Sequence, residues 1–166
     1  ILEQPVAGCL PAIGRVDPTT DNVRNGLSID FSPSSRPALR SGWSDLKRNP
    51  DGTAFAWVTG SEAAVDIFRS TTMAARLIID LWPVRSLAND QRIRLIVNSD
   101  ILGETSLRKG LQRVALNAPA SCWQKGRNLV VLQFWELTEP SPGPGDGRSI
   151  PGRAAGVQRI QIVPLD

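Results

Sequence analysis

A strand, a short polar turn and a second strand are predicted over residues 92–107, and this unit constrains the fold more than any other segment. Ile93, Leu95 and Val97 alternate with neighbours that are mostly polar. Such a period of two is typical of a half-buried strand. Residues 98–100, read as Asn-Ser-Asp, then interrupt the pattern with side chains that favour turns. The unit indicates antiparallel β-structure and carries no catalytic pattern of its own.

The same alternation recurs along the chain and predicts about nine short strands, separated by turn signals at roughly 8–12-residue spacing. The predicted strands are 27–31, 53–59, 63–68, 75–82, 92–98, 101–107, 113–116, 129–135 and 157–163. No segment of helical length shows a period of 3.6. We therefore expect an all-β fold, either a sandwich or a barrel, with no long helix.

The chain of 166 residues is long enough for one domain with its own core. Residues 1–26 lack periodicity, and we expect an irregular N-terminal segment that packs on the domain. The β-sandwich domain then spans 27–166, with a long Pro/Gly-rich loop at 139–156. The chain starts at Ile1 without a signal-peptide pattern, which we interpret as an excised domain or a processed product. No apolar run approaches the roughly 20 residues that cross a bilayer, so we expect no membrane span.

Composition argues against several kinds of chemistry. The 19 Lys and Arg residues exceed the 16 Asp and Glu residues only slightly and are scattered, so we expect no nucleic-acid partner. Histidine is absent from the sequence, which removes the commonest general base and zinc ligand. The closest carboxylate groupings, such as Glu62 and Asp66, fall at turns or on solvent faces. No nucleophile-base arrangement or phosphate-binding motif is present, so we expect no enzymatic activity.

Metal and cysteine patterns leave alternatives open. We expect no cofactor, although several aspartates are available for a structural calcium ion, and none of them has the spacing of a known calcium loop. The two cysteines, Cys9 and Cys122, lie too far apart for a CxxC zinc or redox motif. They either form one long-range disulfide in an oxidising compartment or are two unrelated buried thiols.

Three blocks of the sequence share a pattern with a known group of domains. The first runs from Gly42-Trp43-Ser44 through Phe55-Ala56-Trp57 to the strand at 63–68. The second joins residues 76–82 to the hairpin at 92–107, in which IRLIVNSDILGETSL resembles a valine-asparagine-glycine hairpin. The third, at 125–130, is similar to a proline-glycine-x-asparagine-x-leucine start of a late strand. Ser99 replaces the usual turn glycine and Lys125 stands where proline is common.

Together the blocks resemble the galactose-binding-like, carbohydrate-binding-module-like jelly rolls appended to bacterial extracytoplasmic glycosyltransferases and sulfatase-like enzymes. The resemblance implies an antiparallel jelly-roll β-sandwich that acts as a non-catalytic accessory domain in the periplasm, in secreted protein or at the cell surface. Its expected partner is a glycan or a neighbouring domain of the parent protein. The alternative function is a structural module that docks to a catalytic or membrane domain without binding sugar.

Strand parity divides the tryptophans into core and surface candidates. Trp57 shares a face with Phe55 and is expected in the core. Three other tryptophans are expected at the surface, where an exposed ring flanked by arginine or aspartate is typical of sugar sites. For each ring, the alternative is packing under a loop or against another domain. The candidate ligand-binding residues are Trp82, Asp80, Arg92, Arg94, Trp135 and Trp123.

The strand at 75–82 decides how these candidates meet. If it pairs with the strand at 92–98, Trp82 lies near Arg92 and Asp80 lies near Arg94 on one surface. The alternative is that the two strands belong to opposite sheets and the residues are separated. A second candidate recognition surface is the loop at 139–156.

Overall fold

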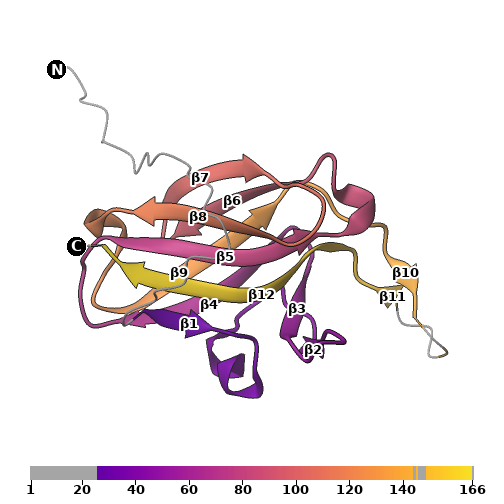
Figure 1. Ribbon diagram of the computed structural model, residues 1–166, viewed down its shortest axis with the longest axis horizontal. Coiled ribbons are helices and arrows are strands. Elements are labelled where there is room, and N and C mark those ends of the chain that lie inside the picture. Colours follow the sequence, from indigo (N-terminus) through magenta and orange to yellow (C-terminus); the bar gives the residue numbers. More distant parts are fainter. Residues whose placement is uncertain (1–25, 144, 146–148, 166) are drawn as a thin grey trace.

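Two antiparallel sheets lie face to face in the computed structural model, which describes residues 26–143, 145 and 149–165 (Figure 1). The first sheet contains β1 (Leu27–Ile29), β2 (Lys47–Arg48), β3 (Ala54–Thr59), β5 (Ala75–Pro83), β8 (Gln112–Ala118) and β12 (Arg153–Pro164). The second sheet contains β4 (Glu62–Arg69), β6 (Arg92–Val97), β7 (Asp100–Ser106) and β9 (Gly126–Phe134). Short 3-10 helices are η1 (Pro33–Ala38), η2 (Arg85–Leu87) and η3 (Ala120–Cys122).

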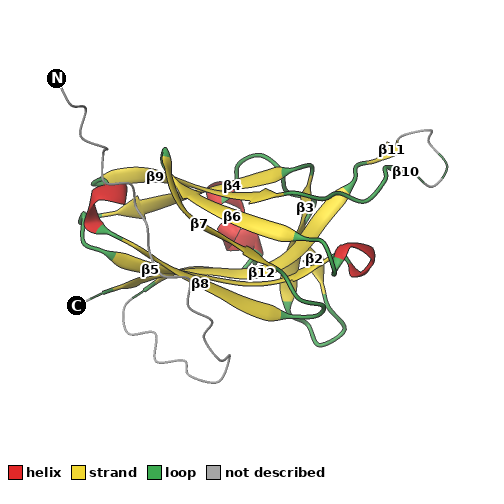
Figure 2. Ribbon diagram, turned by 90° about the horizontal axis from the view of Figure 1, so that it is seen from above, coloured by secondary structure: helices red, strands yellow, loops and turns green. Residues whose placement is uncertain are grey.

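The order of strands places β12 and β5 in the middle of the larger sheet. That sheet runs β2-β3-β12-β5-β8, and β1 pairs with β12 beyond the end of β3. The smaller sheet runs β4-β9-β6-β7. Figure 2 shows the two layers edge-on, with β5, β8 and β12 in one and β4, β6, β7 and β9 in the other. A two-stranded ladder of β10 (Ser141–Pro142) and β11 (Ser149–Ile150) projects from one end of the sandwich (Figure 1).

The prediction of an all-β fold is confirmed, and each of the nine predicted strands forms. The described residues contain three further strands of two residues each, β2, β10 and β11. The segment at 139–156, predicted as one long loop, includes the β10–β11 ladder and the first residues of β12, which begins at Arg153. Residues 1–25, the predicted irregular segment, lie outside the described residues. No helix in the described part of the chain is long and apolar enough to cross a membrane.

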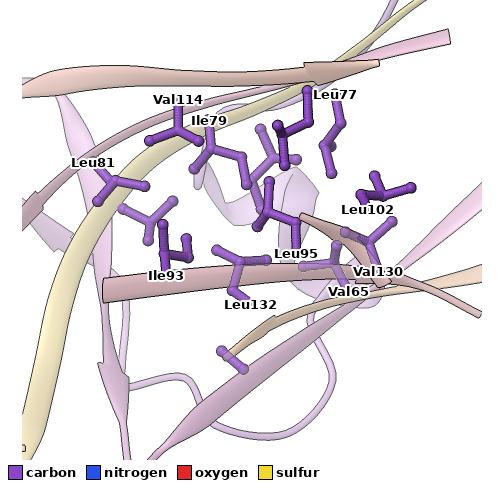
Figure 3. Packing of buried hydrophobic residues seen from close by; sticks show 14 of the residues in the cluster. Val65, Leu77, Ile79, Leu81, Ile93, Leu95, Leu102, Val114, Val130 and Leu132 are labelled. Carbon is purple, nitrogen blue, oxygen red and sulfur yellow. The ribbon is translucent and has the colours of Figure 1, made fainter. Parts of the chain in front are cut away.

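The core lies between the two sheets, where alternate side chains of each strand meet. On β5, Leu77, Ile79 and Leu81 are fully buried and face the smaller sheet (Figure 3). On β6, Ile93 and Leu95 approach them from the other layer. Each fully buried side chain of this kind contributes about 1.5–3 kcal/mol relative to exposure. The alternation predicted from sequence for these strands is therefore the alternation that builds the core.

Two asparagines from the family-like blocks meet inside the structure. Asn98 adopts a φ of 55°, and its side-chain amide donates to Asn128 Oδ1 at 3.0 Å and to the Cys122 carbonyl at 2.9 Å. Its Oδ1 accepts from the backbone N–H of Leu129 at 3.0 Å. Asn128 is fully buried and also bonds both backbone groups of Gln124, at 2.9 Å each. The amide pair fastens the β6–β7 turn to the start of β9, so these motifs specify the fold rather than a ligand.

Replacing Asn128 with alanine should lower the free energy of unfolding by about 2–4 kcal/mol, because several buried backbone groups lose their partners. Urea unfolding measures the change. Gln124→Ala is the control, since that side chain is exposed and makes one hydrogen bond, to the Arg127 carbonyl at 2.7 Å. Equal losses in the two variants would contradict the role assigned to Asn128.

Candidate functional site

The outward side of β3 carries two aromatic side chains. Ala56 and Val58 are fully buried and face the core, so Phe55 and Trp57 point to the opposite side of the sheet. The prediction that Trp57 lies in the core is therefore wrong, whereas Phe55 is buried, but on the outer side of the sheet. Alternation was identified correctly, but the small residues of this strand take the inner face.

Trp82 of β5 joins these two residues in an aromatic cluster, defined as Phe55, Trp57 and Trp82. The Trp82 ring centroid lies 5.1 Å from that of Phe55 and 6.0 Å from that of Trp57. Phe55 and Trp57 are 5.5 Å apart and nearly perpendicular. Phe55 is 8% exposed, whereas both tryptophans are half-buried. The Arg153 guanidinium lies 5.2 Å from the Trp57 ring, so a cation borders the cluster.

A glycine in β12 makes this arrangement possible. Gly156 is paired with Trp57 of β3 on one side and with Trp82 of β5 on the other. It therefore lies between the two strands that carry these rings. A Cβ atom at this position would overlap the Trp82 indole. The absence of a side chain therefore lets the indole lie across β12 toward Phe55 and Trp57.

A buried carboxylate lies two residues from Trp82 along β5. Asp80 is 5% exposed and accepts two hydrogen bonds from Arg113 of β8, at 2.7 and 3.0 Å. Arg159 of β12 donates a further bond at 2.9 Å. Burial by itself would raise the pKa of Asp80, but the hydrogen bonds from Arg113 and then Arg159 outweigh it and leave that pKa below its ordinary value. Asp80 is thus ionised at neutral pH and orients both arginines.

A polar pocket opens at the start of β3, where β12 has a bulge. β3 pairs with β12 as far as Val157 and β1 pairs with it from Ile160, so no described strand pairs with Gln158 and Arg159 on this side. The gap forms a pocket of about 460 Å³. It is lined by Asp30, Ser32, Arg48, Gly52, Thr53, Ala54, Gln158 and Arg159. Together, the aromatic cluster and this polar pocket form the candidate site.

The side chains of the pocket offer both donors and acceptors. Hydrogen bonds from Ser32 and Ser35 keep the pKa of Asp30 below its usual value, so this carboxylate is charged. Arg48 bonds the Gly52 carbonyl at 2.9 Å through one guanidinium nitrogen. Its other N–H groups, and the amide of Gln158, are further hydrogen-bond donors at the pocket. Among the residues that the structure describes, no three His, Cys, Asp or Glu side chains gather as a metal site.

The structure separates the residues predicted to share one surface. Trp82 belongs to the candidate site and Asp80 holds Arg159 of its pocket, but β5 pairs with β8 and β12 and not with β6. Arg92 and Arg94 lie on β6 in the opposite sheet. The pairing that would have brought these residues together is therefore not formed, and the opposite-sheet alternative holds.

Trp135 follows β9 and accompanies Arg94 on the other sheet. The indole is 40% exposed, and the Arg94 guanidinium lies 4.8 Å from its ring. Arg94 is held by Glu104 at 3.0 Å and by Gln133 at 3.3 Å. This is a second, smaller surface that combines a ring with polar groups.

Trp123 behaves differently from the expectation. It follows η3 and is only 4% exposed, with the Arg69 guanidinium 4.3 Å from its ring, so its predicted exposure is wrong.

Cys122 is buried in η3, and its expected partner Cys9 lies outside the described residues. The disulfide between them stays a prediction.

Sequence reasoning missed several residues of the site. The pocket brings Arg48 together with Gln158 and Arg159, which lie where β12 has a bulge between its pairings with β3 and β1. No local sequence pattern predicts such a bulge. Gly156 did carry a signal, because a glycine inside a strand pattern often marks a close approach. That glycine was assigned instead to the Pro/Gly-rich loop.

No family model and no curated protein matches the sequence, whereas solved structures match the fold. A Podospora anserina GH26-CBM35 mannanase has a TM-score of 0.55 at 14% identity over 85% of this chain, which spans 28% of that chain. The C-terminal CBM6 of the Zobellia galactanivorans laminarinase LamC has a TM-score of 0.50 at 12% identity, with 84% of this chain and 99% of that chain covered. A Porphyromonas gingivalis Lys-gingipain adhesin domain has a TM-score of 0.55 at 7% identity, covering 86% of this chain and 100% of that chain.

The chain therefore spans little more than a quarter of the mannanase but nearly the whole of the CBM6 domain. Carbohydrate-binding modules with the jelly-roll sandwich recur among the matches. At such low identities the similarity establishes the fold alone. The prediction of a jelly-roll β-sandwich is confirmed.

A double-mutant cycle on Gly156 and Trp82 tests how the aromatic cluster is built. Gly156→Ala alone should destabilise the protein, because the new methyl group displaces the indole. In a Trp82→Ala background the same change should cost little, which gives a coupling of about 1–3 kcal/mol between the two positions. Urea unfolding of the four proteins measures it. Additive effects would show that Gly156 is needed for another reason.

Acid unfolding tests the role of Asp80. Its pKa in the folded protein lies below the unfolded value of about 3.9, so its contribution to stability is present above that pH and is lost as the pH falls through the folded pKa. Asp80→Asn should therefore be less stable at pH 7 and lose less stability on acidification below about pH 4. Urea unfolding across this pH range, with the exposed Asp90→Asn as control, measures both effects. An unchanged pH profile would contradict this role.

Proposed function

We propose that this domain is a non-catalytic carbohydrate-binding module, an accessory domain of an extracytoplasmic glycan-handling protein. One observation carries the proposal: the half-buried tryptophans of the aromatic cluster lie on β3 and β5, and a polar pocket opens at the start of β3 and the bulge of β12. Sugars have an apolar ring face and a rim of hydroxyls, so they need this combination. The CBM-type fold of the solved structures is consistent with it.

The two parts of the site have separate tasks. The exposed parts of Trp57 and Trp82 offer an apolar surface against which the C–H face of a sugar packs. Arg48, Gln158 and Asp30 line the pocket and supply donors and acceptors for hydroxyls. Hydrogen bonds that involve charged groups contribute about 1.5–3 kcal/mol each, so the pocket decides which sugar is bound.

A second function is favoured by an observation on the other sheet. Ala64, Val131, Ile96 and Ile101 form a row across β4, β9, β6 and β7, in which Ala64 is buried, Val131 and Ile96 are partly exposed and Ile101 is 51% exposed. A partly exposed apolar row suits contact with another domain. The alternative is therefore a structural module that docks through this sheet and binds no sugar.

Affinity electrophoresis in gels that contain soluble polysaccharides tests the proposal. A screen over mannan, laminarin, xylan and acidic polysaccharides should reveal retardation of the wild-type domain. Gln158→Ala and Trp57→Ala should each lower the affinity measured from this retardation about tenfold. Trp135→Ala, which removes a tryptophan beside the opposite sheet, should leave it unchanged. Melting temperatures confirm that each variant is folded.

Two results would count against this function. If the folded wild-type domain is retarded by no polysaccharide, the docking alternative is favoured. If Trp135→Ala removes binding and the pocket variants do not, the glycan site belongs to the other sheet.

A further inference from the structure

The two sheets differ in the charge that their strands carry. The strands of the six-stranded sheet carry six cations, Lys47, Arg48, Arg76, Arg113, Arg153 and Arg159, against one carboxylate, Asp80. The strands of the four-stranded sheet carry four cations, Arg69, Arg92, Arg94 and Arg127, against four carboxylates, Glu62, Asp66, Asp100 and Glu104. The excess of positive charge therefore lies on the sheet that holds the candidate site.

Three arginines of the six-stranded sheet have neutral partners. Arg48 bonds the Gly52 carbonyl at 2.9 Å, and Arg76 bonds Asn117 Oδ1 at 2.9 Å. Arg153 lies over the Trp57 ring at 5.2 Å. All three are at least partly exposed. Their positive charges are positioned by carbonyl, amide and ring contacts and are not neutralised by them.

On the four-stranded sheet two arginines are held by carboxylates, whereas Arg69 donates to the Met73 carbonyl at 2.9 Å and lies over the Trp123 ring. Arg94 is paired with Glu104 at 3.0 Å. Arg127 bonds the buried Asp66 at 2.8 Å, and Arg40 bonds the same carboxylate from the segment that flanks β4. Both sheets therefore contain ion-paired arginines, and they differ in that the strands of the six-stranded sheet carry one carboxylate for six cations.

The acidic groups near the site do not remove the excess. Asp80 is shared by Arg113 and Arg159. Asp30, which lines the pocket, accepts hydrogen bonds from Ser32 and Ser35. The pocket lining thus contains one negative charge, that of Asp30, and two positive charges, those of Arg48 and Arg159.

We propose that the ligand of this site is an anionic glycan, one that carries carboxylate or sulfate groups. The inference rests on the proposed function and adds the chemical class of the ligand. A guanidinium presents two parallel N–H groups that match the two oxygens of a carboxylate or sulfate. Trp57 and Trp82 then contact the sugar ring while the arginines bind its charged substituents.

The spacing of the arginines favours a polymer over a single sugar. Arg76 and Trp82 lie six residues apart on β5, which corresponds to about 20 Å along the strand. Arg153 lies at the Trp82 end of the sheet, and Arg76 lies at the other end. A polysaccharide with charges at intervals can reach cations at both ends, whereas one sugar residue reaches only one.

Isothermal titration calorimetry with paired ligands tests the proposal and separates the sources of charge. Polygalacturonate supplies carboxylates and dextran sulfate supplies sulfates, while galactan and dextran are the neutral counterparts. At least one anionic polymer should bind about tenfold more tightly than its neutral counterpart, and added salt should weaken that binding because it screens the charges. A single-stranded DNA oligonucleotide is the control for nonspecific anion binding, because it carries negative charges but no pyranose rings.

Charge-removing variants locate the effect. Arg153→Gln and Arg48→Gln should each weaken binding of the anionic polymer about three- to tenfold and flatten its salt dependence. Arg92→Gln, which removes an exposed arginine from the opposite sheet, is the matched control and should change neither. Melting temperatures should stay close to that of the wild type, since exposed charges contribute little to stability.

The outcomes distinguish this inference from the function on which it rests. Equal binding of neutral and anionic glycans would overturn the anionic class and leave the glycan site in place. Binding of the oligonucleotide as tight as that of the polysaccharides, or equal losses in Arg92→Gln and Arg153→Gln, would also overturn it. Absence of binding to every glycan would overturn both proposals.

Discussion

The buried carboxylate of Asp80 is the interaction on which the functional side of this sandwich depends. It lies on β5, and its two arginine partners come from β8 and β12, so one side chain connects three neighbouring strands. A carboxylate that is 5% exposed is tolerated only when its oxygens are paired. Removing one partner of such a group typically costs about 3–5 kcal/mol, because an uncompensated charge remains buried. The arrangement also fixes Arg159 at the wall of the pocket, so the interaction that stabilises the sheet also shapes the site.

The aromatic cluster depends on backbone geometry in a similar way. Gly156 leaves room above β12, and Trp82 fills it and packs on Phe55 and Trp57. These contacts bury part of the surface of each tryptophan ring. Trp82 therefore stabilises the outer side of the sheet and also offers a ring face to a ligand. A loss of stability on removing Trp82 would therefore say little about binding, whereas residues of the pocket separate the two effects. Arg48 and Gln158 line the pocket without belonging to the core.

Local sequence patterns predicted the strands well and their arrangement poorly. The alternation in residues 92–97 and 75–82 reports which side chains point inward, and the core contains Ile93, Leu95, Leu77 and Ile79 as expected. Alternation does not report which strand lies beside which, and β5 and β6 fall in opposite sheets. It also does not decide which face is inner when one face is aromatic and the other small, which is why Trp57 was wrongly placed in the core. Trp123 was misjudged because burial of a loop residue is set by distant packing. Of the candidate site, Trp82 was among the predicted residues, and the pocket was not predicted, since it depends on a bulge.

The residues of this domain fall into two groups, those whose replacement would lower stability and those whose replacement would affect only binding. Asn98, Asn128, Gly156 and Asp80 satisfy buried groups or clear space, so their replacement disturbs the fold whatever the ligand. On the same scaffold, Arg48 bonds a carbonyl, Arg153 lies over a ring, and Gln158 lines an open pocket. Because exposed charges contribute so little to stability, such positions can vary without cost to folding. A sandwich of this kind can therefore keep its scaffold while the charge at its site changes, so an arginine-rich site such as the one proposed for this chain can arise without disturbing the fold.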